Sequence, residues 1–361
     1  MATARLSVTV MTHPARSAMA SGLVALLGGE VTVVTDPEPG GAPNPLRTSV
    51  EAWAAFEEGA THHLVLQDDV VPSEDLLTVA RAAAVRFPRS AVAFYANWDG
   101  PDGSAVRLGA LAGAGWVEAI DEIYTPTLAL MLPVEHAARF SEEARPIVPK
   151  RREDDAVMLD YLERHHVPVV VSIPNLIEHQ GTESIAGNSA ERWRSACSHR
   201  NLGVPGSDVL DGLNAVPHYR EGATYALVLE GERAGRRVWR RTPWRRAEQA
   251  LGVDAARVDS SWGAWSRRDQ AARYVEGAIG PAAARELWAA AYLIGLASER
   301  LRPGGWTPDD KVRSAALSTL GVGGLIPVVK WHELEEARFV MHHLAMAGAD
   351  HGASAAADAT A

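Results

Sequence analysis

The amino-acid sequence predicts an α/β protein in which a parallel-rich sheet is covered by helices and followed by a mainly helical region. Over the first 180 residues, short apolar and β-branched runs alternate with helical patterns of about 10–15 residues. After residue 200, patterns rich in Ala, Leu, Trp and Arg recur at helical spacing. The length of 361 residues is enough for two domains.

Each expected strand of the first half ends at a polar or proline-containing turn, which is typical of βα units. A helix generally follows, and Ser73 is a suitable N-cap for one of them. The expected strands are 6–11, 31–35, 63–67, 91–95, 125–132 and 167–172, and the expected helices are 15–27, 47–58, 74–87 and 156–165.

The second half is expected to begin with a strand-like piece and to continue as helices. The strand-like piece is 225–229, and the helical patterns are 269–279, 281–300, 308–320 and 331–347. The final segment is rich in Ala, Gly and Asp and is expected to be disordered. We therefore expect a catalytic or binding domain over 1–200, a helical accessory domain over 201–347 and a disordered tail over 348–361.

Charge and cysteine content exclude several classes of protein. The net charge is −10, and all of the surplus lies in residues 1–200, with 16 basic against 26 acidic side chains, whereas 201–361 carries 19 of each. An acidic half argues against a general grip on nucleic acid. The single cysteine, Cys197, excludes a disulfide framework and a Cys-based zinc cluster. With no signal peptide and no apolar run of 18 residues, we expect a soluble, cytoplasmic protein without a membrane span.

Polar side chains follow the first strands at the point where each strand ends. In open α/β sheets, ligands bind beyond the carboxyl ends of the strands. Thr12, His13 and Arg16 follow the first strand, Asp36 follows the second, and Arg47 begins the next helix. The sequence contains neither GxGxxG after the first strand nor a GxxxxGK[ST] loop, so a nucleotide would not be held by a Rossmann or Walker loop.

Two segments carry further acids. THHLVLQDDVVPSEDLL runs from a buried strand into Asp68 and Asp69, and REDDAVMLDYLERHHVPVVVSIPNLIEHQG places Asp154 and Asp155 at a helix start and His179 after a strand. Together they resemble the acidic motif and the closing third of GT-A glycosyltransferases, notably the lipopolysaccharide-galactosyltransferase-like group. The resemblance spans about residues 1–185. The order Gln67-Asp68-Asp69 departs from a strict D-x-D motif, which leaves open which aspartate meets a metal.

The resemblance implies a GT-A-like, Rossmannoid mixed sheet flanked by helices, followed by the mainly helical domain. It implies a hexosyltransferase that moves a sugar from a nucleoside-diphosphate sugar, with UDP-sugars favoured, to a small-molecule, glycan or peptide acceptor. It also implies a Mn²⁺ or Mg²⁺ ion held by Asp69 and His179, with an imidazole ligand favouring Mn²⁺. Thr12, His13, Arg16, Asp36, Arg47 and Asp68 would bind the donor.

Each of these residues has a structural alternative. A carboxylate of Asp154 or Asp155 would serve as the base that deprotonates the acceptor, which gives an inverting reaction, or both would only stabilise a helix N-terminus. His179 is either a metal ligand or a packed histidine. Arg47 either pairs with a diphosphate or is a surface helix residue, and Asp36-Pro37 is also a common turn. Residues 97–99 (Asn-Trp-Asp) either shape a sugar pocket or form a turn with a half-buried Trp.

Two other readings remain open for the chain. A non-catalytic nucleotide-sugar-binding or scaffolding protein would share the fold, whereas a nucleotidyltransferase is disfavoured because no Gly-rich, basic signature follows the first strand. The arginine-rich segment 233–246, which includes Trp239 and Trp244, either docks on the acidic half or receives an anionic acceptor. Nucleic-acid binding there is disfavoured. The helical domain is a candidate for acceptor binding or for self-association into a homo-oligomer.

Overall fold

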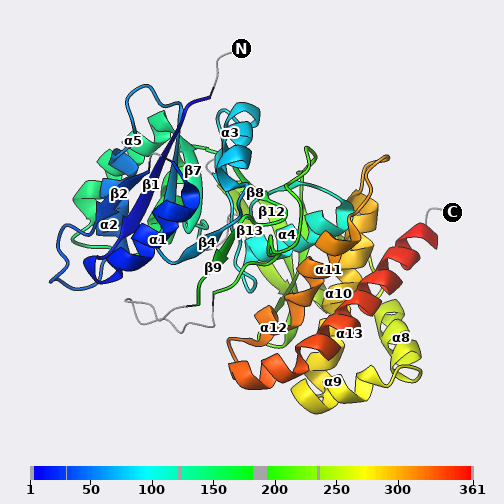
Figure 1. The fold of residues 1–361 in the computed structure, drawn as a ribbon. Helices are drawn as coiled ribbons and strands as arrows, with labels where there is room; N and C mark the ends of the chain where they lie inside the picture. The colour runs from blue at the N-terminus through cyan, green and yellow to red at the C-terminus, as the bar shows by residue number, and fades with distance from the viewer. Residues whose placement is uncertain (1–3, 30, 121–123, 182–192, 234–235, 359–361) are drawn as a thin grey trace.

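The computed structural model describes residues 4–29, 31–120, 124–181, 193–233 and 236–358. Its largest element is a mixed sheet. The strands of this sheet are β1 (Leu6–Thr12), β2 (Thr32–Thr35), β3 (His62–Gln67), β5 (Ala91–Ala93), β6 (Trp116–Glu118), β7 (Ala129–Pro133), β8 (Val169–Ser172) and β10 (Val209–Leu210). Within these residues the sheet has eight strands in the order β10-β6-β8-β5-β7-β3-β1-β2 (Figure 1). The predicted α/β class and mixed sheet are confirmed.

The direction of the strands decides where the site lies. β1 is parallel to both β2 and β3, so the carboxyl ends of all three meet at one edge. β7 is antiparallel to its neighbours β3 and β5. The residues that enter β7 therefore lie at the same edge as the residues that leave β1 and β3.

Helices cover both faces of the sheet. These helices are α1 (Ser17–Leu27), α2 (Pro45–Ala54), α3 (Leu76–Arg86), α4 (Pro101–Ala112), α5 (Val134–Ala144) and α6 (Asp154–Arg164), and the short 3-10 turn η1 (Pro14–Arg16) precedes α1. α1 and α3 pack in one apolar core and α2, α4, α5 and α6 pack in the other. Pro45 begins α2, and the Asn44 side chain caps it by accepting a hydrogen bond from the Arg47 amide.

A second, two-stranded sheet closes over the same edge. β4 (Val70–Pro72) pairs antiparallel with β9 (Ile177–His179), and Val70 lies opposite His179 in this ladder. The amide of Gln180 also donates to the carbonyl oxygen of Asp69 at 2.9 Å. This pairing brings two chain segments that are over 100 residues apart in sequence together beside the aspartates.

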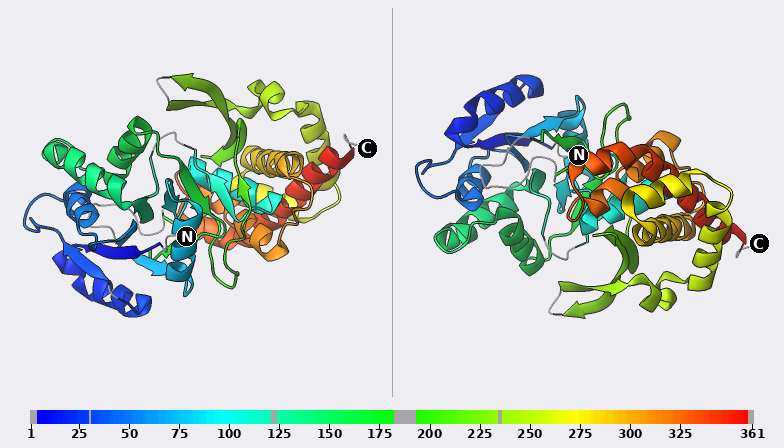
Figure 2. Two further views of the ribbon diagram at one scale, coloured as in Figure 1. Left: turned by 90° about the horizontal axis from the view of Figure 1, so that it is seen from above. Right: turned by 90° about the horizontal axis from the view of Figure 1, so that it is seen from below.

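The region after residue 210 consists of a small sheet and helices. It contains β11 (Ala215–Arg220), β12 (Ala223–Arg233), β13 (Arg236–Pro243), η3 (Trp244–Arg246), α7 (Glu248–Leu251), α8 (Ala255–Ser266), α9 (Ala271–Ile279), α10 (Pro281–Leu301), α11 (Asp310–Ser318), α12 (Leu320–Leu325) and α13 (Trp331–Asp358). The β12–β13 hairpin extends away from the main sheet (Figure 2). The prediction of a mainly helical region is confirmed.

The prediction of a disordered tail is wrong for residues 348–358. α13 continues to Asp358 and buries Gly348, Ala349, Gly352 and Ala356. These small residues let α13 lie close against α10. The segment whose composition suggests disorder therefore forms part of the interface between these two helices.

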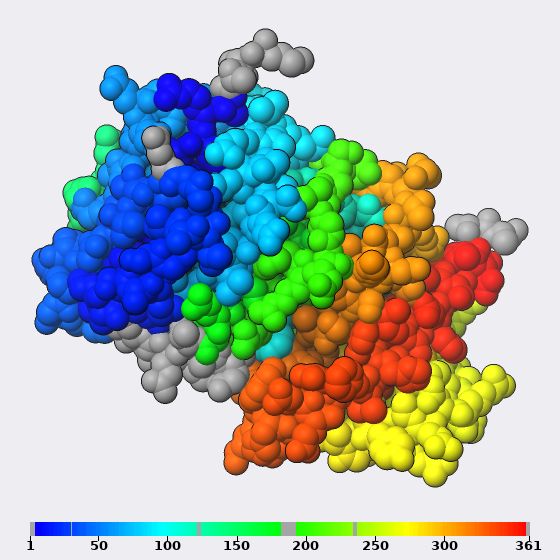
Figure 3. All heavy atoms as spheres, in the orientation of Figure 1, coloured from blue at the N-terminus to red at the C-terminus, as the bar shows by residue number. Residues whose placement is uncertain are grey.

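The boundary predicted at residue 200 does not separate two packing units. β10 joins the edge of the main sheet by pairing in parallel with β6. One apolar core is continuous from Met11 and Val65 in the sheet to Leu287 and Ala356 in the helical region. The chain between residues 198 and 209 runs along the surface where the two regions meet (Figure 3).

Helix α4 is the element that joins the two regions. Every residue from Pro101 to Ala112 is buried, because the sheet lies on one side and α10, α11 and β11 lie on the other. Arg107 is 2% exposed and donates hydrogen bonds to the carbonyl oxygens of Trp98 and Ala316 and to the hydroxyl of Thr319. Its guanidinium thus links the loop after β5 to helices α11 and α12.

The arginine-rich segment is neutralised by the protein's own acids at three places. Arg237 pairs with Glu118 in the first half, at 2.5 Å between Nη1 and Oε1. Other pairs join Arg240 to Glu230 and Arg245 to Asp259. Docking on the acidic half is therefore seen at Arg237.

Among the described residues, no helix combines the length and the apolar character needed to cross a membrane.

We predict that Gly352→Ala destabilises the fold. A methyl group at Gly352 in α13 would collide with the carbonyl oxygen of Tyr292 in α10. Overpacking of this kind costs about 1–3 kcal/mol. Urea unfolding followed by circular dichroism should show a lower midpoint. The control is Gly277→Ala, which places the methyl group in open space on the exposed side of α9 and should be neutral or slightly stabilising. Equal midpoints for both variants would contradict the close contact.

Candidate functional site

The candidate site lies at the carboxyl ends of the parallel strands, as the sequence predicts. In the register of the sheet, Thr12 lies opposite Thr35 and Met11 lies opposite Gln67. The residues that follow these pairs, Asp36 and Asp68, are therefore brought to the end of β1. The amide of Asp36 donates to the carbonyl oxygen of Thr12 at 2.9 Å, which holds the second strand end against the first.

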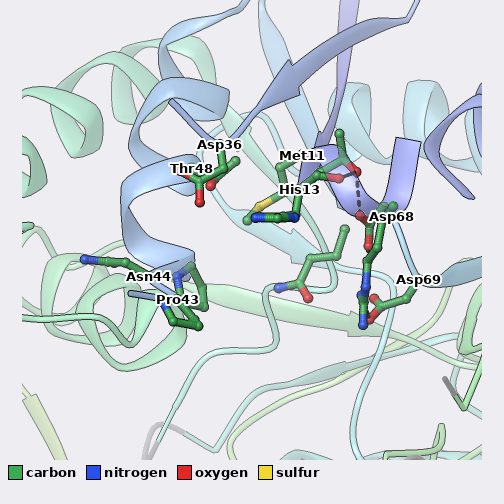
Figure 4. A pocket seen from close by; sticks show the side chains of 12 residues that line it. Met11, His13, Asp36, Pro43, Asn44, Thr48, Asp68 and Asp69 are labelled. Atoms are coloured by element: carbon green, nitrogen blue, oxygen red, sulfur yellow. Dashed lines mark hydrogen bonds and ion pairs between the residues drawn. The ribbon is translucent and has the colours of Figure 1, made fainter. Parts of the chain in front are cut away.

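A solvent-open cavity of about 140 Å³ lies at this edge (Figure 4). In Figure 4, Asp36, Thr48 and Asn44 form one side of the cavity and Asp68 and Asp69 form the opposite side. The lining residues are Met11, Thr12, His13, Arg16, Asp36, Pro43, Asn44, Pro45, Thr48, Gln67, Asp68 and Asp69.

Asp36 and Arg47 form a bidentate pair on one wall. The Arg47 Nε and Nη2 atoms each lie 2.7 Å from a carboxylate oxygen of Asp36. This pairing with Arg47, together with a hydrogen bond from the Glu38 amide, lowers the pKa of Asp36 although partial burial acts against it. The structure thus pairs Arg47 with Asp36. This pair keeps the Asp36 carboxylate ionised and fixed in position.

Asp68 and Asp69 share one guanidinium on the other wall. The Arg16 Nη1 atom lies 3.1 Å from Oδ1 of Asp68 and 2.7 Å from Oδ2 of Asp69, and the Thr12 hydroxyl donates to Oδ2 of Asp68 at 2.5 Å. Burial raises the pKa of Asp68. Burial also opposes ionisation of Asp69, but contact with His179 and Arg16 lowers its pKa below the usual value. Asp69 is therefore the more strongly ionised member of the pair.

His179 lies next to Asp69 because of the β4–β9 ladder. Its Nε2 atom is 3.5 Å from Oδ2 of Asp69, and the ring is buried. The amide of Gly181 donates to the Nδ1 atom of His179 at 3.0 Å. A nitrogen that accepts this hydrogen bond carries no proton, so the neutral ring carries its proton on Nε2, facing Asp69.

The donor set has the chemistry of a divalent-cation site with few protein ligands. Oδ1 of Asp69 is buried and has no hydrogen-bond partner in the described part of the chain. Such an atom is costly unless a cation or donor meets it. A carboxylate oxygen beside an imidazole nitrogen fits Mn²⁺ better than Mg²⁺. Over the described ranges, no group of three or more His, Cys, Asp or Glu side chains is arranged to hold a metal, so a ligand would have to supply further oxygens.

A second cavity, of about 190 Å³, adjoins the first. The two cavities share Pro45, Gln67 and Asp69 in their walls. The second is lined by Pro45, Gln67, Asp69, Tyr95, Asn97, Tyr124, Pro126, Thr127, Leu128, Asp154, Asp155, His179 and Trp193. Asp69 and its neighbour Gln67 therefore stand at the junction between the cavity near Asp36 and the cavity near Asp154.

The structure distinguishes Asp154 from Asp155. Asp155 is half-buried, and its Oδ1 atom accepts a hydrogen bond from the Ala156 amide at 2.7 Å, so it serves the N-terminus of α6. Asp154 is 7% exposed, and Oδ2 has no hydrogen-bond partner among the residues described. Burial, reinforced by the charge of Asp155, raises the pKa of Asp154 to about 7. A carboxylate with a pKa near neutrality is suited to accept a proton at physiological pH.

The structure thus gathers the candidate residues that the sequence singles out. Those proposed for donor binding lie in or beside the first cavity, Asp154 and Asp155 line the second, and Asp69 and His179 lie where the cavities meet. The loop after β5 divides. Asn97 lines the second cavity, whereas Trp98 is buried against Trp331 of α13, with 6.1 Å between ring centroids, and Asp99 lies 3.6 Å from Arg220.

Sequence reasoning missed several lining residues, above all Tyr124, Thr127 and Trp193. Tyr124 and Thr127 precede β7, whose antiparallel direction places them at the ligand edge. The polar residues 125–127 (TPT) before an apolar run indicate a possible site residue. They can be assigned to the ligand edge only once the antiparallel direction of β7 is known. Trp193 follows the segment 182–192, which lies outside the described residues, and no pattern in the sequence marks it.

Comparison with models of known protein families and with curated proteins finds no match to this chain.

Proposed function

We propose that the protein is a glycosyltransferase that moves a hexose from a nucleoside-diphosphate sugar, in the first place a UDP-sugar, to a hydroxyl group of a small-molecule, glycan or peptide acceptor. The observation that carries this proposal is the pair of adjoining cavities that share Asp69. One cavity has fixed polar groups suited to a nucleotide, and the other contains a buried carboxylate suited to act as a base. The GT-A-like resemblance of the acidic segments agrees with this assignment.

The first cavity would hold the nucleoside diphosphate. Thr12, His13 and the ionised Asp36 offer hydrogen-bonding groups to the base and ribose, and Arg47 keeps Asp36 in place. Arg16, whose planar guanidinium suits phosphate oxygens, lies beside the aspartates where the cavities meet. The diphosphate would therefore lie near Asp69, with the sugar extending into the second cavity.

The second cavity would hold the sugar and the acceptor. We propose that the ionised Asp154 accepts the proton of the acceptor hydroxyl as its oxygen attacks the anomeric carbon. The bond between this carbon and the diphosphate breaks, and the diphosphate leaves with the bonding electron pair. Attack from the side opposite the leaving group inverts the anomeric configuration. Asp155, whose Oδ1 accepts a hydrogen bond from the Ala156 amide, is assigned to the helix N-terminus.

Asp69 and His179 would hold a Mn²⁺ or Mg²⁺ ion, whose contribution is Lewis-acid stabilisation of the charge that develops on the diphosphate. The supporting observation is the buried, unpaired Oδ1 of Asp69, as judged over the described residues.

The test uses the purified full chain with UDP-, GDP- and dTDP-sugars and Mn²⁺, and measures both nucleotide binding by calorimetry and release of nucleoside diphosphate. Binding of one nucleotide together with transfer to an added sugar, peptide or small-molecule acceptor supports the proposal. Binding without hydrolysis or transfer across the acceptor panel would support a non-catalytic nucleotide-sugar-binding protein. Absence of binding for every nucleotide would refute both.

A further inference from the structure

Arg16 occupies an unusual place for a cation. It is the last residue of η1 and the N-cap of α1, where the partial positive charge of the helix disfavours a positive side chain by about 0.3–1 kcal/mol. Its side chain is nevertheless 13% exposed and turned inward, with Nη1 in contact with both Asp68 and Asp69. The two carboxylates therefore hold the guanidinium in this position.

This contact limits what Asp69 offers to a divalent cation. Its Oδ2 atom already contacts Arg16 at 2.7 Å, and a cation bound to the same carboxylate would be repelled by the guanidinium. The two aspartates carry at most two negative charges, and Arg16 cancels one of them. The protein alone thus provides a weak electrostatic attraction for a dication.

The second candidate ligand is also engaged within the protein. The hydrogen bond from the Gly181 amide to Nδ1 of His179 places the ring proton on Nε2, the atom that faces Asp69. Metal binding through Nε2 needs the opposite tautomer, in which Nδ1 carries the proton. Of the two candidate metal ligands, Asp69 and His179, only Asp69 offers an atom that is ready for a cation in the absence of a nucleotide. This atom is Oδ1, which has no hydrogen-bond partner among the described residues.

Resting on the function proposed above, we propose that Arg16 makes cation binding conditional on the nucleotide. A diphosphate brings negative charge and oxygen ligands, and its oxygens compete with Asp69 for the Arg16 guanidinium. The Asp69 carboxylate is then released towards the cation. Nucleotide and cation therefore bind with positive coupling, and by linkage each raises the affinity for the other by the same factor.

The experiment measures Mn²⁺ binding by the loss of the free-ion electron paramagnetic resonance signal, with and without UDP, for the wild type, Arg16→Gln and Arg16→Lys. The wild type is expected to bind Mn²⁺ weakly alone and more tightly with UDP. Arg16→Gln removes the charge, so it should bind Mn²⁺ alone about tenfold more tightly and show a smaller enhancement by UDP. Arg16→Lys retains the charge and should resemble the wild type in Mn²⁺ affinity without UDP.

The inference is overturned if Arg16→Gln binds Mn²⁺ alone no better than the wild type, or if UDP leaves the Mn²⁺ affinity of the wild type unchanged although UDP itself binds. Thermal unfolding verifies that each variant is folded, and Arg16→Met replaces Arg16→Gln if that variant does not fold. Failure of the proposed function is a different result, in which the wild type binds no UDP, GDP or dTDP in the presence of Mn²⁺.

Discussion

Replacing Asp154 by asparagine is expected to lower kcat of sugar transfer by about 10²–10⁴-fold, the contribution typical of a general base. The amide keeps the shape of the side chain but cannot accept the proton of the acceptor hydroxyl. Nucleotide binding should remain, because Asp154 lies in the second cavity and the nucleotide is assigned to the first. Steady-state kinetics with the sugar donor identified by the panel, together with calorimetry, separates the two effects.

The matched control is Asp155→Asn, which changes the neighbouring acid on the same helix. Because Asp155 bonds to the helix N-terminus, its replacement should lower transfer much less than replacement of Asp154. The reverse order of the two variants would assign the base to Asp155. If Asp154→Asn and Asp155→Asn both kept the full activity of the wild type, neither of these two aspartates of α6 could be the base.

The pH dependence follows from the raised pKa of Asp154. The carboxylate is the active form, so kcat/KM should rise with pH, reach half of its limiting value near pH 7 and level off about one pH unit higher. A second readout is independent of activity. Between the ordinary aspartate pKa of about 4 and about 7, the folded protein keeps a proton that the unfolded chain has released. Stability therefore falls as pH rises through this window, and Asp154→Asn should weaken that dependence.

Replacing Asp69 by asparagine is the second change with a large expected effect. We expect transfer to fall by about 10²–10³-fold, since several kcal/mol of charge stabilisation on the diphosphate depend on this carboxylate. Mn²⁺ should no longer strengthen UDP binding in this variant, because the neutral amide is a poor ligand. Calorimetry with UDP, in the presence and absence of Mn²⁺, measures this directly.

Asp75→Asn is the control for Asp69→Asn. Asp75 is an exposed acid at the start of α3, six residues further along, and it lines neither of the two cavities described. Its replacement should leave both transfer and the Mn²⁺ effect unchanged. Full activity of Asp69→Asn, with a Mn²⁺ effect equal to that of the wild type, would refute the metal assignment.

The alternating first third of the fold was predictable because its helices each expose one face. α2 and α3 have the polar and apolar sides that a pattern reveals, and the end of α1 is marked by Gly28 and Gly29. Helix α4 was missed for the opposite reason. Most of its residues are apolar or small, and its polar residues Asp102, Ser104 and Arg107 are all buried. The helix therefore has no solvent-facing side that a polar stripe in the sequence could reveal.

The candidate site was predictable where it depends on strand ends. The sequence predicts that Asp36, Asp68 and Asp69 lie together, because parallel strands bring the residues that follow them to one edge, and all three line the first cavity. What could not be predicted is which acids are already paired. The bidentate bond between Arg47 and Asp36 and the sharing of Arg16 by two aspartates depend on loop geometry that no local pattern encodes. The distinction between Asp154 and Asp155 likewise depends on burial, which tertiary packing decides.

The two-residue strand β10 has a consequence for how the protein is made. Because Val209 and Leu210 complete the edge of the main sheet beside β6, the ribosome must synthesise beyond residue 200 before that edge is covered. A nascent chain that ends earlier presents the unpaired backbone of β6 to other chains. Helix α4 meanwhile lacks the helices that bury its outer side. The first 200 residues are therefore unsuited to an independent existence, and gene fusion or shuffling at that point would separate parts that must fold together.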